Sequence, residues 1–194
     1  MELHRRKNLR LVVSNRQKEI IIGSLLGDAH ITARGQIQFE QSTNQREYLL
    51  WKKDELETIS YRNVSFVKRL DKRNRKETSS YRFWTRQFFQ DLRKIFYFNN
   101  KKIVPKDIQL TPLTIAVWYM DDGCFSDNKY IISTDGFRLN DILFLQRLLL
   151  DTFNIKSSLK NGSKILISRI SMKKFSLLID PYIIHSMRYK FLTP

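Results

Sequence analysis

Two apolar helices that each end in an aspartate constrain the fold of this chain most strongly. Ser14 and Gln17 form a predicted capping box, and the apolar run behind them predicts a buried helix that ends near Asp28. Thr111 is a typical N-cap, and the helix behind it is predicted to end at Asp122. An aspartate is unfavourable beside the carbonyls of a helix C-terminus. Two such aspartates therefore favour a functional role over ordinary surface acids.

The same order of elements follows both helices. In the first half we expect a hairpin over residues 30–41, a helix over 44–59, strands over 63–70 and 79–86, and a helix over 87–98. In the second half we expect a strand over 130–133, a helix over 140–153, a hairpin over 156–169 turned at 161–162, and a helix over 171–181. The chain is therefore predicted to be a duplication, divided into residues 1–105 and 106–194.

Two lysines support the duplication. Lys102 follows Asp28 by 74 residues and Lys190 follows Asp122 by 68, and each lies just beyond the closing helix of its half. Similar spacing indicates equivalent positions in two related halves. Without the repeat, both lysines would be read as ordinary solvated side chains.

The first helix also carries a groove. Gly23 and Gly27, four residues apart, lie on one helix face and allow another helix backbone to approach closely. Ala116 and Met120 are the expected contact face of the second helix. If the helices pack side by side, the two terminal aspartates meet at one end of the pair.

The chemistry expected there follows from the atoms present. A carboxylate beside unsatisfied helix-terminal carbonyls makes an all-oxygen, electronegative site, which suits Mg²⁺. Two acids can share metal ions that activate water and stabilise the leaving oxygen of a phosphodiester. The single cysteine, Cys124, excludes an internal disulfide, and no closely spaced Cys/His cluster predicts a zinc site.

The charge balance indicates a polyanionic partner. The chain has 35 Lys and Arg against 19 Asp and Glu, a net charge of +16, and 42% hydrophobic residues, enough for a core. A structural RNA-binding protein would show the same excess charge, so composition alone does not separate a binder from an enzyme. No apolar run approaches the roughly 18–20 residues of a membrane span. We therefore expect a soluble, intracellular protein that is not secreted.

Polar side chains that alternate along the predicted strands favour DNA contact, because Gln and Arg offer paired donors to purine edges in the major groove. The alternation is clearest at Gln36, Gln38 and Glu40. The full set of predicted DNA-binding residues is Arg34, Gln36, Gln38, Glu40, Lys72, Arg73, Arg75, Arg82, Arg86, Lys129, Lys156, Lys160 and Lys164.

The two acidic helices resemble a known motif. Residues 21–29 (IIGSLLGDA) and 115–123 (IAVWYMDDG) look like two copies of the LAGLIDADG motif, and nearly the whole chain is similar to single-chain homing endonucleases of group I introns. The resemblance implies an α+β fold of two pseudo-symmetric αββαββα halves, packed along the motif helices. Their antiparallel sheets would form a saddle over the DNA.

The resemblance also implies roles for individual residues. Asp28 and Asp122 would bind two or three shared Mg²⁺ or Mn²⁺ ions, assisted by the carbonyls of Gly27 and Asp121. Lys102 and Lys190 would be the basic residues that polarise water or stabilise the transition state. The expected protein is a monomer that cuts both strands of a long, asymmetric DNA site.

Two departures from the motif and two rival functions stay open. Ala29 replaces the usual glycine, and Val117 is bulkier than the residue often found there, so the helix pair need not be symmetric. Relatives also act as maturases that bind their host intron RNA, and a non-cleaving DNA-binding protein is the third reading.

Richness in Lys, Asn, Ile and Phe suggests an AT-rich genome, so a mitochondrion or plastid is favoured and a bacterium is possible.

Overall fold

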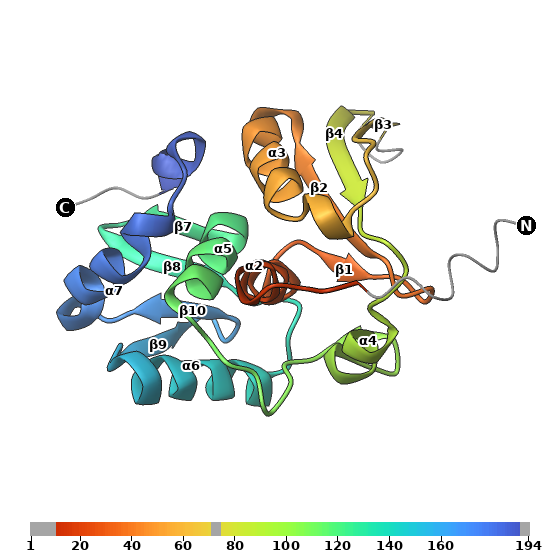
Figure 1. Cartoon of the computed structure of the whole chain (residues 1–194). Helices are drawn as coiled ribbons and strands as arrows, with labels where there is room; N and C mark the ends of the chain where they lie inside the picture. Colours follow the sequence, from red (N-terminus) through yellow and green to blue (C-terminus); the bar gives the residue numbers. More distant parts are fainter. Residues whose placement is uncertain (1–10, 71–74, 191–194) are drawn as a thin grey trace, which may run out of the picture.

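The computed structural model describes residues 11–70 and 75–190 and contains two halves of like construction (Figure 1). The first half contains α2 (Asn15–Leu26), β1 (His30–Ile31), β2 (Ile37–Ser42), α3 (Arg46–Glu55), β3 (Ser65–Leu70), β4 (Glu77–Trp84) and α4 (Gln90–Phe96). The second half contains α5 (Pro112–Asp122), β7 (Gly123–Ser126), β8 (Lys129–Ser133), α6 (Leu139–Phe153), β9 (Ser157–Lys160), β10 (Lys164–Ile167) and α7 (Met172–Ile179). A short hairpin, β5 (Tyr97–Phe98) and β6 (Lys101–Lys102), follows α4.

Short 3₁₀ turns complete the connections. They are η1 (Thr43–Gln45), η2 (Glu57–Ile59), η3 (Arg169–Ser171), η4 (Asp180–Tyr182) and η5 (His185–Lys190). The turns η1 and η2 flank α3, so the helix predicted over 44–59 is shorter than expected.

Each half contains one four-stranded sheet, and the two sheets have the same topology. The strand orders are β1-β2-β4-β3 and β7-β8-β10-β9, and every neighbouring pair is antiparallel. The predicted α+β class and the αββαββα order of both halves are confirmed. The exact division of the chain after residue 105 stays a prediction.

The helix starts follow the capping chemistry read from the sequence. The hydroxyl oxygen of Ser14 accepts a hydrogen bond from the Gln17 amide, and the Gln17 side chain accepts one from the Ser14 amide, both at 3.1 Å. The Thr111 side chain accepts a bond of 3.1 Å from the amide of Thr114. Two orphan donors at the start of α2 and one at the start of α5 are thereby satisfied.

The helices α2 and α5 lie side by side at the centre of the molecule, with one sheet on either side (Figure 1). A Cβ atom on Gly23 would lie 2.5 Å from the Thr114 carbonyl oxygen and 2.8 Å from the Val117 Cβ. A Cβ atom on Gly27 would lie 2.5 Å from the Cβ of Asp121. All three distances are below normal contact, so the absence of a Cβ atom at both glycines allows the two helices to pack this closely.

These contacts correct one prediction. The glycines face Thr114, Val117 and Asp121, which share one helix face at spacings of three and four residues, rather than Ala116 and Met120. Asp121, at the end of the second motif, therefore packs against Gly27 of the first motif. Hydrophobic patterning alone does not predict this contact.

Replacing Gly23 with alanine is expected to lower the free energy of unfolding by about 1 to 3 kcal/mol, because the helices must separate to admit the methyl group. Urea denaturation measures the change. Gly136→Ala is the matched control, since nothing lies within 4 Å of a Cβ atom at that position. Equal stability of the two variants would contradict the close helix contact.

Each half builds its core between one face of its sheet and the helices. In the first half Phe39 of β2 stacks on Phe83 of β4 with ring centroids 4.8 Å apart. In the second half Tyr130 of β8 lies 5.3 Å from Phe175 of α7. Because strand side chains alternate between faces, the neighbours of these residues point to the opposite face of each sheet.

Two further boundaries were predicted wrongly. The strand β7 was not predicted, because it begins directly after the helix end predicted at Asp122, where Gly123 pairs with Ile132 of β8. The closing helix expected over 87–98 is limited to α4, because residues 97–98 leave the helix to pair with Lys101 and Lys102. This small hairpin turns the chain so that Lys102 points back toward α2.

Candidate functional site

The ends of α2 and α5 bring Asp28 and Asp122 to one place. Asp28 is exposed and Asp122 is half-buried. Burial, followed by the negative charges of Asp28 and Asp121, raises the pKa of Asp122 to about 7, against the opposing charges of Lys102 and Lys190. The acids are therefore close enough to repel one another, and a cation bound between them would relieve that repulsion.

Both predicted lysines extend to the helix ends that carry Asp28 and Asp122. The Lys102 ammonium donates to the carbonyl oxygens of Gly27 at 2.8 Å and Ala29 at 2.9 Å. Burial lowers the pKa of Lys102, while the charges of the site aspartates oppose the shift. The lysine therefore caps the carbonyl end of α2 and carries positive charge to the acids.

Lys190 does the same for α5. Its ammonium donates to the carbonyl oxygens of Met120 and Asp121, each at 2.7 Å, and burial lowers its pKa as well. The carbonyls of Gly27 and Asp121, the predicted auxiliary metal ligands, are thus both hydrogen-bonded to lysines here. Positive charge at helix C-termini is stabilising in its own right, so each lysine has a structural role beside any chemical one.

The side chain of Asp121 contacts residues of the first half. Its two oxygens accept hydrogen bonds of 2.7 and 2.9 Å from the Lys52 ammonium of α3, and both side chains are almost fully buried. Burial raises the pKa of Asp121 and the Lys52 ammonium opposes that shift. The same carboxylate accepts a hydrogen bond of 3.4 Å from the backbone amide of Asp28, so Asp121 also contacts the first of the two acids.

Gln41 lies between Asp28 and Asp121 and was not among the predicted site residues. Its side-chain amide donates to Asp28 at 2.9 Å and to Asp121 at 3.1 Å. A signal was present in the sequence, because alternation along β2 puts Gln41 on the same face as the buried Ile37 and Phe39. A polar side chain in the apolar phase of a strand needs a buried partner.

A cavity of about 310 Å³ opens beside Asp122. It is lined by Leu26, Gly27, Lys102, Asp122 and the loop over residues 133–137. Groups from both halves therefore face one space next to the half-buried acid.

The outer faces of the two sheets carry five of the thirteen predicted DNA-binding residues: Gln38, Glu40, Arg82, Lys160 and Lys164. In the first sheet Gln38 pairs with Trp84 and Glu40 with Arg82. In the second sheet Lys164 pairs with Lys160. Cross-strand partners point to the same side of a sheet, so these side chains share the face opposite the core. The predicted polar surface exists on both sheets.

Glu40 on that face already has hydrogen-bond and ion-pair partners within the protein. It forms an ion pair with Arg69 and accepts hydrogen bonds from Ser80 at 2.5 Å and from Gln38 at 2.9 Å. The Arg69 bond is the main cause that lowers the pKa of Glu40. Arg69 was not predicted, since its charge on β3 does not stand out among many basic residues.

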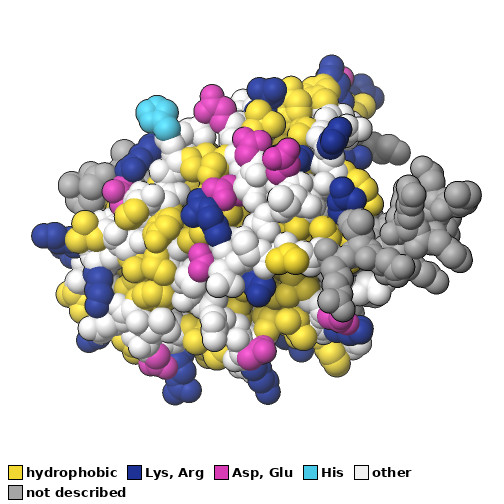
Figure 2. Space-filling view, viewed as in Figure 1, with side chains coloured by type: hydrophobic (Ala, Val, Ile, Leu, Met, Phe, Trp, Pro, Cys, Tyr) yellow, Lys and Arg dark blue, Asp and Glu magenta, His cyan; other side chains and the backbone are white. Residues whose placement is uncertain are grey.

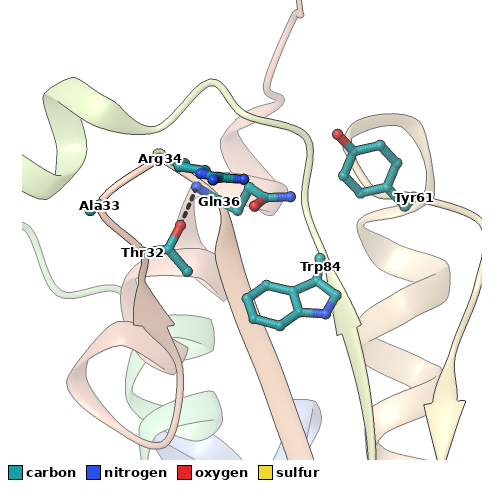
Figure 3. Close-up of a pocket in the computed structure, with 6 residues that line it drawn as sticks. All are labelled: Thr32, Ala33, Arg34, Gln36, Tyr61 and Trp84. Atoms are coloured by element: carbon teal, nitrogen blue, oxygen red, sulfur yellow. Dashed lines mark hydrogen bonds between the residues drawn. The ribbon is translucent and has the colours of Figure 1, made fainter.

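A pocket of about 520 Å³ lies at the β1–β2 end of the first sheet. It is lined by Thr32, Ala33, Arg34, Gln36, Tyr61 and Trp84. In Figure 3 the side chains of Arg34 and Gln36 lie across the opening from Tyr61, with the Trp84 indole below them. Arg34 and Gln36 are thus brought together beside two aromatic rings, an arrangement suited to nucleobase edges and faces.

Six predicted residues remain. Arg75, Arg86, Lys129 and Lys156 are exposed. Lys72 and Arg73 lie outside the described residues. On the face drawn in Figure 2, basic side chains are scattered among acidic and apolar ones. On this face the basic residues form no continuous patch.

Among residues 11–70 and 75–190, no helix has the length and apolarity required to cross a membrane.

The fold is a duplication with paired acids at the ends of its two central helices. Comparison with known proteins identifies the family to which it belongs. Residues 18–177 match the LAGLIDADG DNA endonuclease family. The chain therefore belongs to that family, as the two motifs indicated.

One solved structure and two sequence relatives illustrate the likeness. The homing endonuclease I-WcaI bound to its DNA recognition sequence superposes with a TM-score of 0.88 at 26% identity, over 100% of this chain and 94% of that chain. The DNA endonuclease I-ChuI of Chlamydomonas applanata is 27% identical over 92% of this chain and 95% of its own length. The cytochrome b mRNA maturase bI2 of Saccharomyces cerevisiae is 32% identical over 88% of this chain, and the match spans 46% of the yeast protein.

Proposed function

We propose that the protein is a site-specific homing endonuclease that makes a metal-dependent double-strand break in a long, asymmetric DNA target. The observation that carries the proposal is the meeting of Asp28 and Asp122 at the paired helix ends, in a molecule whose two sheets each have a polar outer face. The likeness to a DNA-bound homing endonuclease supports the same reading. Because of the pseudo-two-fold symmetry, one chain would face both strands of a duplex, so a monomer would be able to cut both strands.

The groups at the site fit a hard divalent cation. Asp28 and Asp122 would bind two or three Mg²⁺ or Mn²⁺ ions, with the carbonyl oxygens of Gly27 and Asp121 nearby, and oxygen donors are what these ions prefer. When bound, the metal would supply Lewis-acid stabilisation of charge on the phosphate oxygens.

Lys102 and Lys190 would supply positive charge close to the phosphate. Their ammonium groups are anchored on helix-end carbonyls and lie within the electrostatic reach of Asp122. From these positions they would orient a water molecule by hydrogen bonding and stabilise negative charge that develops on the phosphate.

Metal affinity should depend on pH. Because the pKa of Asp122 is about 7 in the metal-free protein, protons and metal ions compete for its carboxylate below neutrality. We expect the apparent Mg²⁺ affinity to fall up to about tenfold per unit as the pH drops below 7, and to level off above about 8. Titration with Mg²⁺ at pH 5.5 to 8.5 measures this. An affinity that does not change over that range would contradict it.

DNA binding should depend on salt through the lysines of the second sheet. Replacing Lys160 and Lys164 with glutamine is expected to reduce the slope of log K against log salt by about 0.9 for each phosphate that the variant no longer neutralises. Lys174→Gln on α7 is the control, because α7 packs on the core side of that sheet. An equal slope for both variants would contradict DNA binding by the second sheet.

The test of the function compares two DNA substrates. Duplex DNA that carries the intronless insertion site should be cut in both strands, and the same DNA interrupted by the intron should not. A maturase role, with the host intron RNA as partner, is the second candidate because the yeast relative is named as a maturase. Accelerated splicing of the intron without DNA cleavage would favour it. A mitochondrial or plastid location stays our expectation, which the cytochrome b relative fits.

A further inference from the structure

The two site lysines are held by different kinds of backbone structure. Lys102 belongs to the hairpin of β5 and β6, where it pairs with Tyr97 of the neighbouring strand. Lys190 is the last residue of the 3₁₀ turn η5. The backbone of Lys102 is therefore placed by strand pairing, whereas the backbone of Lys190 is placed in another way.

The hydroxyl group of Tyr119 on α5 holds the backbone of Lys190. It donates a hydrogen bond of 2.7 Å to the backbone carbonyl oxygen of Lys190. The Lys190 ammonium in turn donates to the carbonyl oxygens of Met120 and Asp121 on the same helix, each at 2.7 Å. Lys190 is thus attached to α5 at both ends, through its backbone carbonyl and through its ammonium group.

The ring of Tyr119 has a fixed position. It is fully buried, and its centroid lies 5.8 Å from that of Tyr130 and 5.6 Å from that of Phe175, edge-on to both rings. A Cβ atom on Gly123 would lie 2.2 Å from a carbon atom of the Tyr119 ring, so glycine at that position leaves room for the ring. Because a closely packed ring cannot swing aside, its hydroxyl group is a fixed point for the Lys190 backbone.

The first motif differs from the second at both of these positions. Counted from the terminal aspartates, the residue equivalent to Tyr119 is Leu25, and the residue equivalent to Gly123 is Ala29. Leucine has no hydroxyl group to hold a lysine backbone. It also has no ring that requires the space left by a glycine, so the departure of Ala29 from the usual motif fits the absence of a tyrosine in the first half.

We propose that Tyr119 is a positioning residue for Lys190: its hydroxyl group fixes the Lys190 backbone so that the ammonium group stays at the helix end that carries the acids. The inference rests on the proposed endonuclease function. Lys102 and Lys190 lie at the ends of different motif helices, and the pseudo-two-fold symmetry would put each nearer to one DNA strand. Loss of the Tyr119 hydroxyl group should therefore slow cleavage of one strand and spare the other.

The test uses a supercoiled plasmid that carries the insertion site. Tyr119→Phe removes one oxygen atom and keeps the ring. Scission of one particular strand should become about ten- to hundredfold slower than in wild type, so that circles nicked in the other strand accumulate. DNA affinity in Ca²⁺ and the Mg²⁺ concentration for half-maximal cleavage should stay within about twofold of wild type, because the acids and the outer sheet faces are unchanged.

Tyr130→Phe is the matched control. Tyr130 is buried in the same cluster of rings, but its hydroxyl group is hydrogen-bonded to Ser176. This variant should cut both strands at the rates of wild type. Equal slowing of both strands by Tyr119→Phe, or cleavage as in wild type, would overturn the positioning role.

A double variant tests whether Tyr119 acts through Lys190. If it does, adding Tyr119→Phe to Lys190→Met should slow cleavage no further than Lys190→Met alone. A further loss in the double variant would overturn the proposal. If Tyr119→Phe does not fold, Tyr119→Leu, which copies Leu25 of the first motif, is measured in the same way.

A measurement without DNA separates this proposal from the endonuclease function. If the wild-type protein cuts no insertion-site DNA, the endonuclease function fails, and reductive methylation of the DNA-free protein then decides the role of Tyr119. In Tyr119→Phe the Lys190 ammonium should be methylated about threefold or more faster than in wild type and Tyr130→Phe, because its segment opens more often, while Lys102 is unchanged. Equal methylation of Lys190 in all three proteins would overturn the positioning role.

Discussion

Replacing either Asp28 or Asp122 with asparagine is expected to lower the rate of double-strand cleavage by about a thousandfold or more, while DNA affinity changes by less than about threefold. Asparagine keeps the shape of the side chain but removes the charge that a divalent cation requires. A loss of this size is what removal of a group that stabilises transition-state charge typically produces. Single-turnover cleavage rates in Mg²⁺ and binding constants in Ca²⁺ measure the two effects separately.

The free energy of unfolding gives a second test of the role of Asp122. Within the folded protein the pKa of Asp122 is about 7 rather than the ordinary 3.8, so ionisation destabilises the metal-free fold as the pH rises between those values. Asp122→Asn should therefore raise the free energy of unfolding by about 1 to 3 kcal/mol at pH 8 without metal, and have little effect near pH 4. A variant that loses both activity and stability at pH 8 would indicate a structural role for the carboxylate instead.

Replacing Lys52 with methionine is expected to lower the free energy of unfolding by about 3 to 5 kcal/mol, because it leaves the Asp121 carboxylate buried without its cation. The double variant Lys52→Met with Asp121→Asn should recover a large part of that loss, since no unpaired charge remains. Urea denaturation of the four proteins of this cycle gives the coupling energy directly.

The exposed ion pair between Arg16 and Glu55 is the matched control. It is 2.5 Å long, but the side chain of Arg16 is 50% exposed, against 1% for Lys52. Arg16→Met should change the free energy of unfolding by less than about 1 kcal/mol. Additive losses in the Lys52 and Asp121 variants would show that the buried pair contributes little.

Much of the fold could be predicted because its signals are local. The capping box at Ser14, the N-cap at Thr111 and the turn at Asn161-Gly162 each rest on neighbouring residues, and all three are present. The order of helices and hairpins then follows from hydrophobic periodicity. The short strand β7 escaped because four residues after a helix stop contain too little alternation.

The site was predictable only in part, because its contacts join distant segments. The aspartates and lysines were found from the repeat, and the structure brings all four to the helix ends. The side chains that donate to Asp121 lie on β2 and α3, 80 and 69 residues away in the chain, and no spacing rule predicts them. The register between α2 and α5 was likewise missed, since only the packed helices reveal that Val117 faces Gly23.

The most direct test of the central claim is strand-resolved cleavage after Mg²⁺ is added to a metal-free complex of the wild-type protein with its intronless insertion site. We predict no scission before the metal is added, and afterwards scission of both strands at fixed positions. A stable complex in which Mg²⁺ produces no scission, or scission that proceeds without a divalent cation, would contradict a metal-dependent endonuclease built on Asp28 and Asp122.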